Sequence, residues 1–309
     1  MALSIENFKI EIIPTVDFVV KQLLGVQVRS YITCHFLNAL LQWENPITSV
    51  TIRNPFIEKD FEEDKLSILD VLAVDSLNHR FNVEIQRFQQ TWLAGRLTYY
   101  GSSLLVEQLG EGDSYIGLRP VISVCLLNGQ LLTEAGSYHH EFRLRTQDGL
   151  ELSNLMQIHL LELPKYQPTS DNGVIEDPTE QWVYFFKYAE GMMSHDLLQR
   201  LADPLFEELV EILKMIQRTP EQRLLYELRV RAERDYITGL EAARREGEAS
   251  GEARGKARGK AEGVALGRLR ALQQVLGLPE ITDTEFETLD SIAIERIISE
   301  LQDRIRNRS

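Results

Sequence analysis

Two apolar segments of strand length, joined by a short polar stretch, constrain the fold of this chain most strongly. The segments read LSILDVLAV and RFNVEIQRF, and residues 75–79 (DSLNH) separate them. Apolar runs bounded by turn-forming residues are typical of two antiparallel strands joined in a hairpin. With the turn centred near Leu77, Asp70 and Glu84 are each seven residues from the centre and are expected to face each other.

This hairpin would place two carboxylates among apolar neighbours. Gln86 is expected to project from the same side as Glu84, because strand side chains alternate between faces. Like charges directly opposed across a strand pair are destabilising, so a compensating cation is expected. Oxygen ligands of this kind suit Mg²⁺ or Mn²⁺, with positions left for water and a substrate phosphate. The alternative interpretation is that both acidic residues are simply exposed to solvent.

The segments around the hairpin alternate between helical and strand patterns and predict an α/β fold. Before it come a helical segment at 17–42, which is one helix or two broken near Gly25, and the strand ITSVTI. After it come a helix from Trp92 to about Leu109 and the buried strand PVISVCLL. HHEFRLRT and LMQIHLLEL read as further strands, and the spacing becomes helical again from 180 to 236. We therefore predict a mixed sheet flanked by helices, followed by a helical C-terminal region.

Three domains are expected from these patterns. Residues 1–165 would form the sheet-containing core, 166–240 a helical extension, and 241–309 a helical tail. In the tail a glycine recurs every fourth residue, alternating with alanines among Glu, Arg and Lys: Gly247, Gly251, Gly255, Gly259, Gly263 and Gly267. Each costs a helix about 1 kcal/mol relative to alanine. A paired helix, homodimeric or folded against the body, would offset this cost; a solvated linker leading to terminal helices is the alternative.

Composition narrows the classes of function. The net charge of −14 argues against a protein that coats nucleic acid non-specifically, although a nuclease needs only a local basic surface. Cys34 and Cys125 lie in apolar runs and are expected to be buried, and no cysteine pair has zinc-ligand spacing. We expect no membrane segment and no signal peptide, and therefore a cytoplasmic location.

The order and spacing of several motifs resemble a known family. PTVDFVVKQLLG, FLNALLQ, LSILDVLAVD, RFNVEIQ, RLTYYGSSLLVEQLGEGDSY and LRPVISVCLL follow one another between Pro14 and Leu127. Together they resemble the Rpn family of recombination-promoting nucleases and transposase-like proteins, within the PD-(D/E)XK nuclease superfamily. The resemblance continues more loosely through HHEFRL, IHLLEL and the glycine-repeat tail. It implies a restriction-endonuclease-like fold and a metal-dependent DNA endonuclease.

The resemblance also assigns roles to individual residues. It implies that Asp70 and Glu84 are the metal-binding carboxylates and that the main-chain carbonyl of Ile85 is a further ligand. Gln86 stands where the wider superfamily has lysine, and the Rpn-type subgroup shares this ExQ form. Asp17 matches an extra acidic position of many members, and a helix N-terminus would equally favour an acidic residue there.

Glutamine carries no positive charge to stabilise a developing oxyanion, so that stabilisation is expected from the metal or from another cation near the site. Arg96 and Arg87 are the candidates, although for Arg87 we favour the interpretation that it is a solvated surface charge. Tyr99 and Tyr100 are expected in the core.

Two functions are consistent with the sequence. The first is a Mg²⁺- or Mn²⁺-dependent endonuclease acting on DNA, with recombination or transposition implied by the family alone. The second is a catalytically inactive interaction module that forms a homodimer or binds a partner through its helical tail. His139 and His140 cannot share one metal ion, because adjacent strand residues point to opposite faces.

Overall fold

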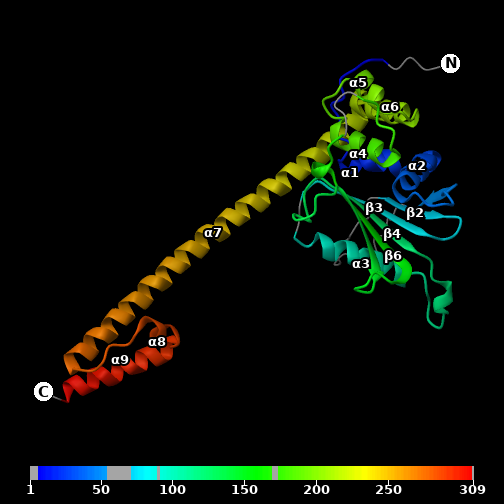
Figure 1. Ribbon diagram of the computed structural model, residues 1–309. Coiled ribbons are helices and arrows are strands. Elements are labelled where there is room, and N and C mark those ends of the chain that lie inside the picture. Colours follow the sequence, from blue (N-terminus) through cyan, green and yellow to red (C-terminus); the bar gives the residue numbers. More distant parts are fainter. Residues whose placement is uncertain (1–5, 54–70, 89–90, 169–172, 308–309) are drawn as a thin grey trace. The chain divides into compact units, whose positions relative to one another are not determined.

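The computed structural model describes residues 6–53, 71–88, 91–168 and 173–307, and Figure 1 shows its elements. The chain forms two compact units, Met1–Ala232 and Glu233–Ser309. The units therefore divide at 232, whereas domain boundaries were expected at 165 and 240. No helix among the described residues is long and apolar enough to cross a membrane.

A mixed sheet forms the centre of the first unit. Its strands are β1 (Val50–Ile52), β2 (Val71–Asp75), β3 (Arg80–Gln86), β4 (Val121–Leu127), β5 (His139–Arg145) and β6 (Glu151–Glu162). They lie in the order β1-β2-β3-β4-β6-β5. β3, β4 and β6 are parallel, and the remaining neighbours are antiparallel. The predicted α/β fold with a mixed sheet is confirmed.

The helical segment predicted at 17–42 is two helices. α1 (Asp17–Leu24) ends at Gly25, and α2 (Ser30–Leu41) begins after the short 3-10 turn η1 (Gln27–Arg29). A Cβ atom on Gly25 would lie 2.8 Å from the main-chain oxygen of Lys21, closer than side chains tolerate. Glycine at this position therefore permits the chain to turn sharply between the two helices.

One face of the sheet carries the main hydrophobic core. α1 and α2 pack there together with α4 (Pro178–Tyr188), α5 (Ser194–Arg200) and α6 (Leu205–Arg218). Trp182 of α4 is 1 % exposed and contacts Phe36 and Phe206. Helices that follow residue 165 thus share a core with the strands, which explains why the first unit extends beyond the expected boundary.

The opposite face is covered by α3 (Leu93–Val106), which connects β3 to the parallel strand β4 (Figure 1). Leu93 and Leu97 pack with Cys125, Leu127 and Leu160 from the sheet. Cys34 and Cys125 are both buried, as predicted.

The second unit has a small core of its own. The long helix α7 (Pro220–Leu276) ends there and packs with α8 (Asp283–Glu287) and α9 (Ser291–Arg306) through residues such as Leu269, Phe286 and Ile298. Gly277 ends α7 with a φ of 67°, and the side chain of Thr282 caps the start of α8. The predicted terminal helices are confirmed.

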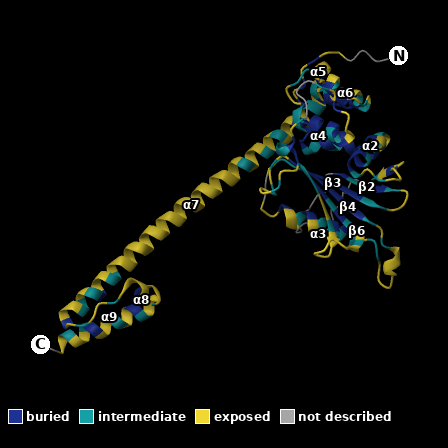
Figure 2. Cartoon of the chain, in the orientation of Figure 1, coloured by how far each residue is buried: buried dark blue, intermediate teal, exposed yellow. Residues whose placement is uncertain are grey.

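The glycine repeat lies within α7, where its residues are exposed (Figure 2). A Cβ atom at any of the six glycines from 247 to 267 would meet no atom within 4 Å. Pairing through this stripe, with a second copy of the chain, stays a prediction.

Replacing those six glycines by alanine tests that prediction. We expect each substitution to stabilise the helix by about 0.5–1 kcal/mol, because alanine has the higher helix propensity and no clash opposes it. Thermal unfolding followed by circular dichroism at several protein concentrations measures the effect. A glycine-mediated dimer predicts the contrary result, in which the variant unfolds earlier and loses the concentration dependence of the parent protein.

Candidate active site

Strand β3 presents Glu84 toward the face of the sheet covered by α3. Phe81, Val83 and Ile85 point into the main core, so the alternate residues Asn82, Glu84 and Gln86 point the other way. β3 lies between β2 and β4, and Glu84 aligns with Cys125 of the parallel strand. The carboxylate therefore projects from an inner strand of the sheet, beside Cys125 of β4.

The Glu84 carboxylate is fully buried and forms an ion pair with α3. Arg96 donates a hydrogen bond from Nη2 to Oε2 of Glu84 at 3.0 Å. The side chain of Arg96 is 23 % exposed and that of Glu84 is 0 % exposed. Arg96, one of the two candidate cations, thus contacts the candidate site directly.

Two aromatic rings flank the Arg96 guanidinium. Its central carbon lies 5.7 Å from the ring centre of Trp92 and 5.3 Å from that of Tyr100, distances at which cation–π attraction contributes. Burial raises the pKa of Tyr100, although the nearby Arg96 charge opposes this rise. Tyr100 is half-buried, but Tyr99 is 68 % exposed, so the prediction that Tyr99 lies in the core is wrong.

The described hairpin has the expected turn and register. Val71 pairs with Val83 and Val74 with Arg80. The Asp75 carboxylate accepts hydrogen bonds from the main-chain N–H groups of Leu77 and His79, which fixes the turn. Asp70, the expected partner of Glu84, lies outside the described residues.

The other predicted site residues lie in different surroundings. Gln86 is half-buried at the end of β3, where its carbonyl accepts a hydrogen bond from Asn128. The Ile85 side chain is in the core, so only its main chain is suited to ligation. Asp17 opens α1 and lies 4.0 Å from both Lys21 and Arg229. Arg87 is half-buried with its guanidinium 5.8 Å from the Phe88 ring, which corrects the expectation of a solvated charge.

The chemistry of this donor set fits a hard divalent cation. Glu84 offers a carboxylate and Ile85 a carbonyl, both oxygen ligands of the type that Mg²⁺ and Mn²⁺ prefer. Within the described ranges, no group of three His, Cys, Asp or Glu side chains could hold a metal ion. A carboxylate this deeply buried requires a positive partner, and Arg96 meets that need in the structure.

Comparison with protein families identifies the relatives of this chain. Residues 14–243 match the family described as PD-(D/E)XK nuclease family transposase. The chain belongs to this family. The match covers the whole sheet, the helices on both of its faces and the beginning of α7, so membership in the PD-(D/E)XK nuclease family supports a nuclease activity. Searches of curated proteins and of solved structures gave no significant match.

Glu162, at the end of β6, is a second buried acid in this family member, and it was not predicted from the sequence. Glu162 is fully buried and accepts hydrogen bonds from Lys165 and from the main chain of Leu131 and Leu132. Burial raises the pKa of Glu162, but these donors outweigh it and lower the pKa overall. The hydrogen bonds to Glu162 therefore satisfy its carboxylate and give it a structural role. Its position in an apolar strand did not indicate this role in the sequence.

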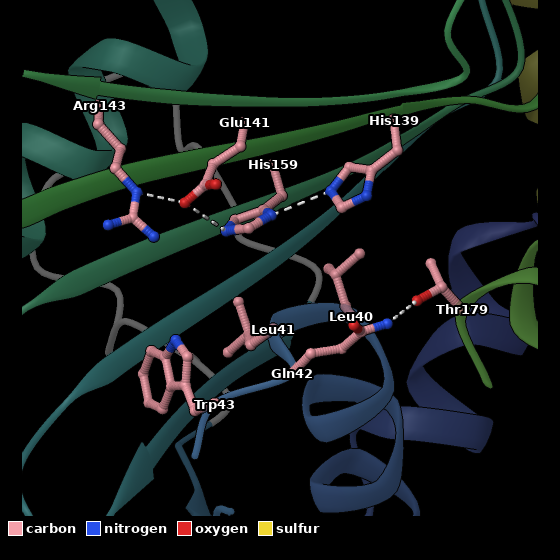
Figure 3. A pocket seen from close by; sticks show the side chains of 9 residues that line it. All are labelled: Leu40, Leu41, Gln42, Trp43, His139, Glu141, Arg143, His159 and Thr179. Atoms are coloured by element: carbon pink, nitrogen blue, oxygen red, sulfur yellow. Dashed lines mark hydrogen bonds and ion pairs between the residues drawn. The ribbon is translucent and has the colours of Figure 1, made fainter. Parts of the chain in front are cut away.

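A pocket of about 190 Å³ lies on the other face of the sheet. Figure 3 shows a row of polar side chains from β5 and β6, namely His139, His159, Glu141 and Arg143, above residues from the end of α2. Nε2 of His139 lies 3.0 Å from Nδ1 of His159. His140 instead contacts Glu162, so the two adjacent histidines point to opposite faces, as predicted.

The buried His159 gives a testable pH dependence. Burial, followed by the nearby His139, lowers the pKa of His159 from 6.5 to about 4. The unfolded state therefore binds more protons between these values, and stability present above pH 6.5 is lost as the pH falls. We expect the free energy of unfolding to fall by about 2–3 kcal/mol from pH 7 to pH 4.5 on account of this residue.

Urea denaturation across that pH range measures the effect. The variant His159→Gln should flatten the pH dependence, whereas His195→Gln, which changes an exposed histidine, should leave it as in the parent protein. Equal slopes in the parent protein and His159→Gln would contradict the assignment.

Proposed function

We propose that this member of the PD-(D/E)XK nuclease family is a Mg²⁺- or Mn²⁺-dependent endonuclease that hydrolyses phosphodiester bonds in DNA. The observation that carries the proposal is the fully buried Glu84 carboxylate on an inner strand of the sheet, in contact with Arg96. An ionised carboxylate buried this deeply needs positive charge beside it, which Arg96 supplies in the structure and a bound cation would also supply. A role in recombination or transposition belongs to the proposal and is supported by the family description alone.

Each residue of the site has a part in this proposal. Asp70, Glu84 and the carbonyl of Ile85 would hold the cation, and Gln86 would orient a water molecule or the phosphate through its amide. The bound cation would supply Lewis acidity toward a phosphoryl oxygen and lower the pKa of the attacking water.

Arg96 provides the positive charge that Gln86 lacks. Its guanidinium lies beside the buried carboxylate and presents several N–H donors, the geometry with which arginine binds phosphate oxygens. We therefore assign Arg96 to charge stabilisation at the scissile phosphate, while Trp92 and Tyr100 hold its side chain in place. The role of Asp17 is proposed on the family resemblance only.

Cleavage of supercoiled plasmid tests the proposal. We expect nicking with Mg²⁺ or Mn²⁺, none with a chelator, and none with Asp70→Ala. Glu107→Ala is the control, because Glu107 is an exposed acid that pairs with Arg80 at the end of α3. A folded protein that binds DNA but cuts it with neither metal would overturn the proposal in favour of an interaction module.

The tail distinguishes the two functions further. An interaction module that assembles a homodimer through its tail should lose self-association when the segment after Arg244 is removed. The family match ends at residue 243. If the protein is a nuclease, we therefore expect the truncated chain to cleave DNA. Sedimentation of the full-length and truncated chains, beside the plasmid assay, separates the two properties. A cytoplasmic location belongs to the nuclease proposal as well, since DNA is its substrate.

A further inference from the structure

The pocket between α2 and strands β5 and β6 is separate from the candidate active site. Glu84 aligns with Cys125, and Cys125 with Leu160. His159 is the neighbour of Leu160 on the same strand, so it points to the opposite face of the sheet. The pocket is lined from that face, and none of its residues has a part in the proposed cleavage.

The polar wall of the pocket carries no net charge at neutral pH. Glu141 and Arg143 are bound to each other, and burial lowers the pKa of both His139 and His159, which are therefore neutral imidazoles. A binding site for phosphate or another anion would need an excess of cationic donors. The wall instead offers hydrogen-bond donors and acceptors to an uncharged ligand.

One polar group in this wall lacks a hydrogen-bond partner. His159 is 4 % exposed, and no hydrogen bond to its Nε2 atom is found among the described residues. The nearest carboxylate oxygen, Oε1 of Glu141, is 3.9 Å away, beyond hydrogen-bond distance. The Nε2 atom is itself covered by protein, so a ligand in the pocket would meet the partly exposed Glu141 carboxylate beside it rather than this atom.

The facing wall is apolar and aromatic. Leu40 and Leu41 end α2, and Trp43 follows them. The Trp43 ring is held in place by ring contacts to His79 and Phe81, with centres 5.4 and 6.0 Å away. Figure 3 shows Trp43, Leu41 and Gln42 on the side of the pocket opposite the histidines. A ligand between the walls would thus meet an apolar surface on one side and hydrogen-bonding groups on the other.

We propose that this pocket binds a nucleobase, the uncharged heteroaromatic ring of a purine or pyrimidine. Such a ring has an apolar face for Trp43 and the leucines, and an edge of donors and acceptors for Glu141, His139 and Gln42. The volume of about 190 Å³ accommodates a base. The base has two sources, a free nucleoside or an unpaired base of the DNA.

Fluorescence titration with 2-aminopurine riboside, without metal, tests the proposal independently of any cleavage. We expect saturable quenching as the base stacks beside Trp43. Affinity should fall by about tenfold or more in Trp43→Leu and in Glu141→Gln. His140→Gln is the matched control, because this neighbouring histidine points to the opposite face, and it should bind as the parent protein does. Gln42→Asn, at an exposed residue, provides a variant that is not expected to disturb folding.

Two further arms identify the source of the base. Duplexes that carry 2-aminopurine either unpaired, opposite an abasic site, or paired with thymine are titrated in the same way. Preference for the unpaired duplex, lost in Trp43→Leu, assigns the pocket to DNA, and binding of the riboside without that preference assigns it to a free nucleoside. No saturable quenching by any probe up to about 10 mM, or equal displacement by inorganic phosphate and by guanosine, would overturn the proposal.

Discussion

Replacing Glu84 by glutamine is expected to reduce DNA cleavage by about a hundredfold to a thousandfold while the protein stays folded. Glutamine has nearly the same shape as glutamate, so the sheet around position 84 should be preserved. It removes the charge that would bind the divalent cation, and electrostatic contributions of this kind reach about 10²–10³ in rate for a single group. Initial rates of plasmid nicking at saturating Mg²⁺ measure the loss.

Glu162→Gln is the matched control for this experiment. Glu162 is equally buried, lies at the end of a strand in the same sheet, and forms an ion pair with Lys165. Its replacement should lower stability and leave the nicking rate of the folded protein within a fewfold of the parent value. Equal loss of activity in both variants would show that cleavage depends on general stability rather than on the charge at position 84.

Replacing Arg96 by methionine is expected to destabilise the protein by about 3 kcal/mol at neutral pH. Methionine fills much of the same space, but it leaves the buried Glu84 carboxylate without the guanidinium that now neutralises it. Removing one partner of a buried ion pair typically costs about 3–5 kcal/mol, and the partial exposure of Arg96 favours the lower end. Urea denaturation of the parent and the variant measures the difference.

The stability of Arg96→Met in the presence of divalent metal tests whether the cation binds at Glu84. If the cation binds at Glu84, Mg²⁺ should restore part of the stability that Arg96→Met has lost, since ligands stabilise the state they bind. The double variant Glu84→Gln, Arg96→Met has no buried charge at this position. It should be more stable than Arg96→Met, and Mg²⁺ should not change its stability. A double variant that is less stable than Arg96→Met would contradict a direct coupling of the two side chains.

The hairpin could be predicted from sequence because its turn is encoded locally. Asp75 binds the main chain of the turn through its own side chain, and Asn78 takes a φ of 67°, which asparagine tolerates well. The symmetry of the apolar runs about this turn gave the register observed between Val71 and Val83. Local turn chemistry and strand alternation therefore sufficed to place Glu84 on its face of the sheet.

The surroundings of the candidate site depended on tertiary packing and were less predictable. Tyr99 was expected in the core, yet the buried side of α3 carries Leu97, Gly101 and Leu104. Gly101 lies close to the sheet, where an added Cβ atom would be 3.4 Å from Ser123 Oγ. A glycine gives no apolar signal, so helical spacing could not identify this close approach.

The base-sized pocket could not have been predicted, because its walls come from α2, β5, β6 and α4. His159 lies in the apolar run IHLLEL, where it reads as one polar interruption of a buried strand. Only the pairing of Glu141 with His159 across β5 and β6 brings the two histidines and the Glu141–Arg143 pair together. Long-range strand pairing of this kind leaves no trace in local spacing.

The outer strands of the described sheet also bear on how copies of the chain can meet. An unpaired strand edge is a template for edge-to-edge aggregation, which proteins resist with short strands, charges and bulges. β1 has only three residues, and β5 combines charged residues with register shifts between Arg143 and Arg145. The charged residues of β5 that line the pocket thus also discourage the edge of a second sheet from pairing with this strand.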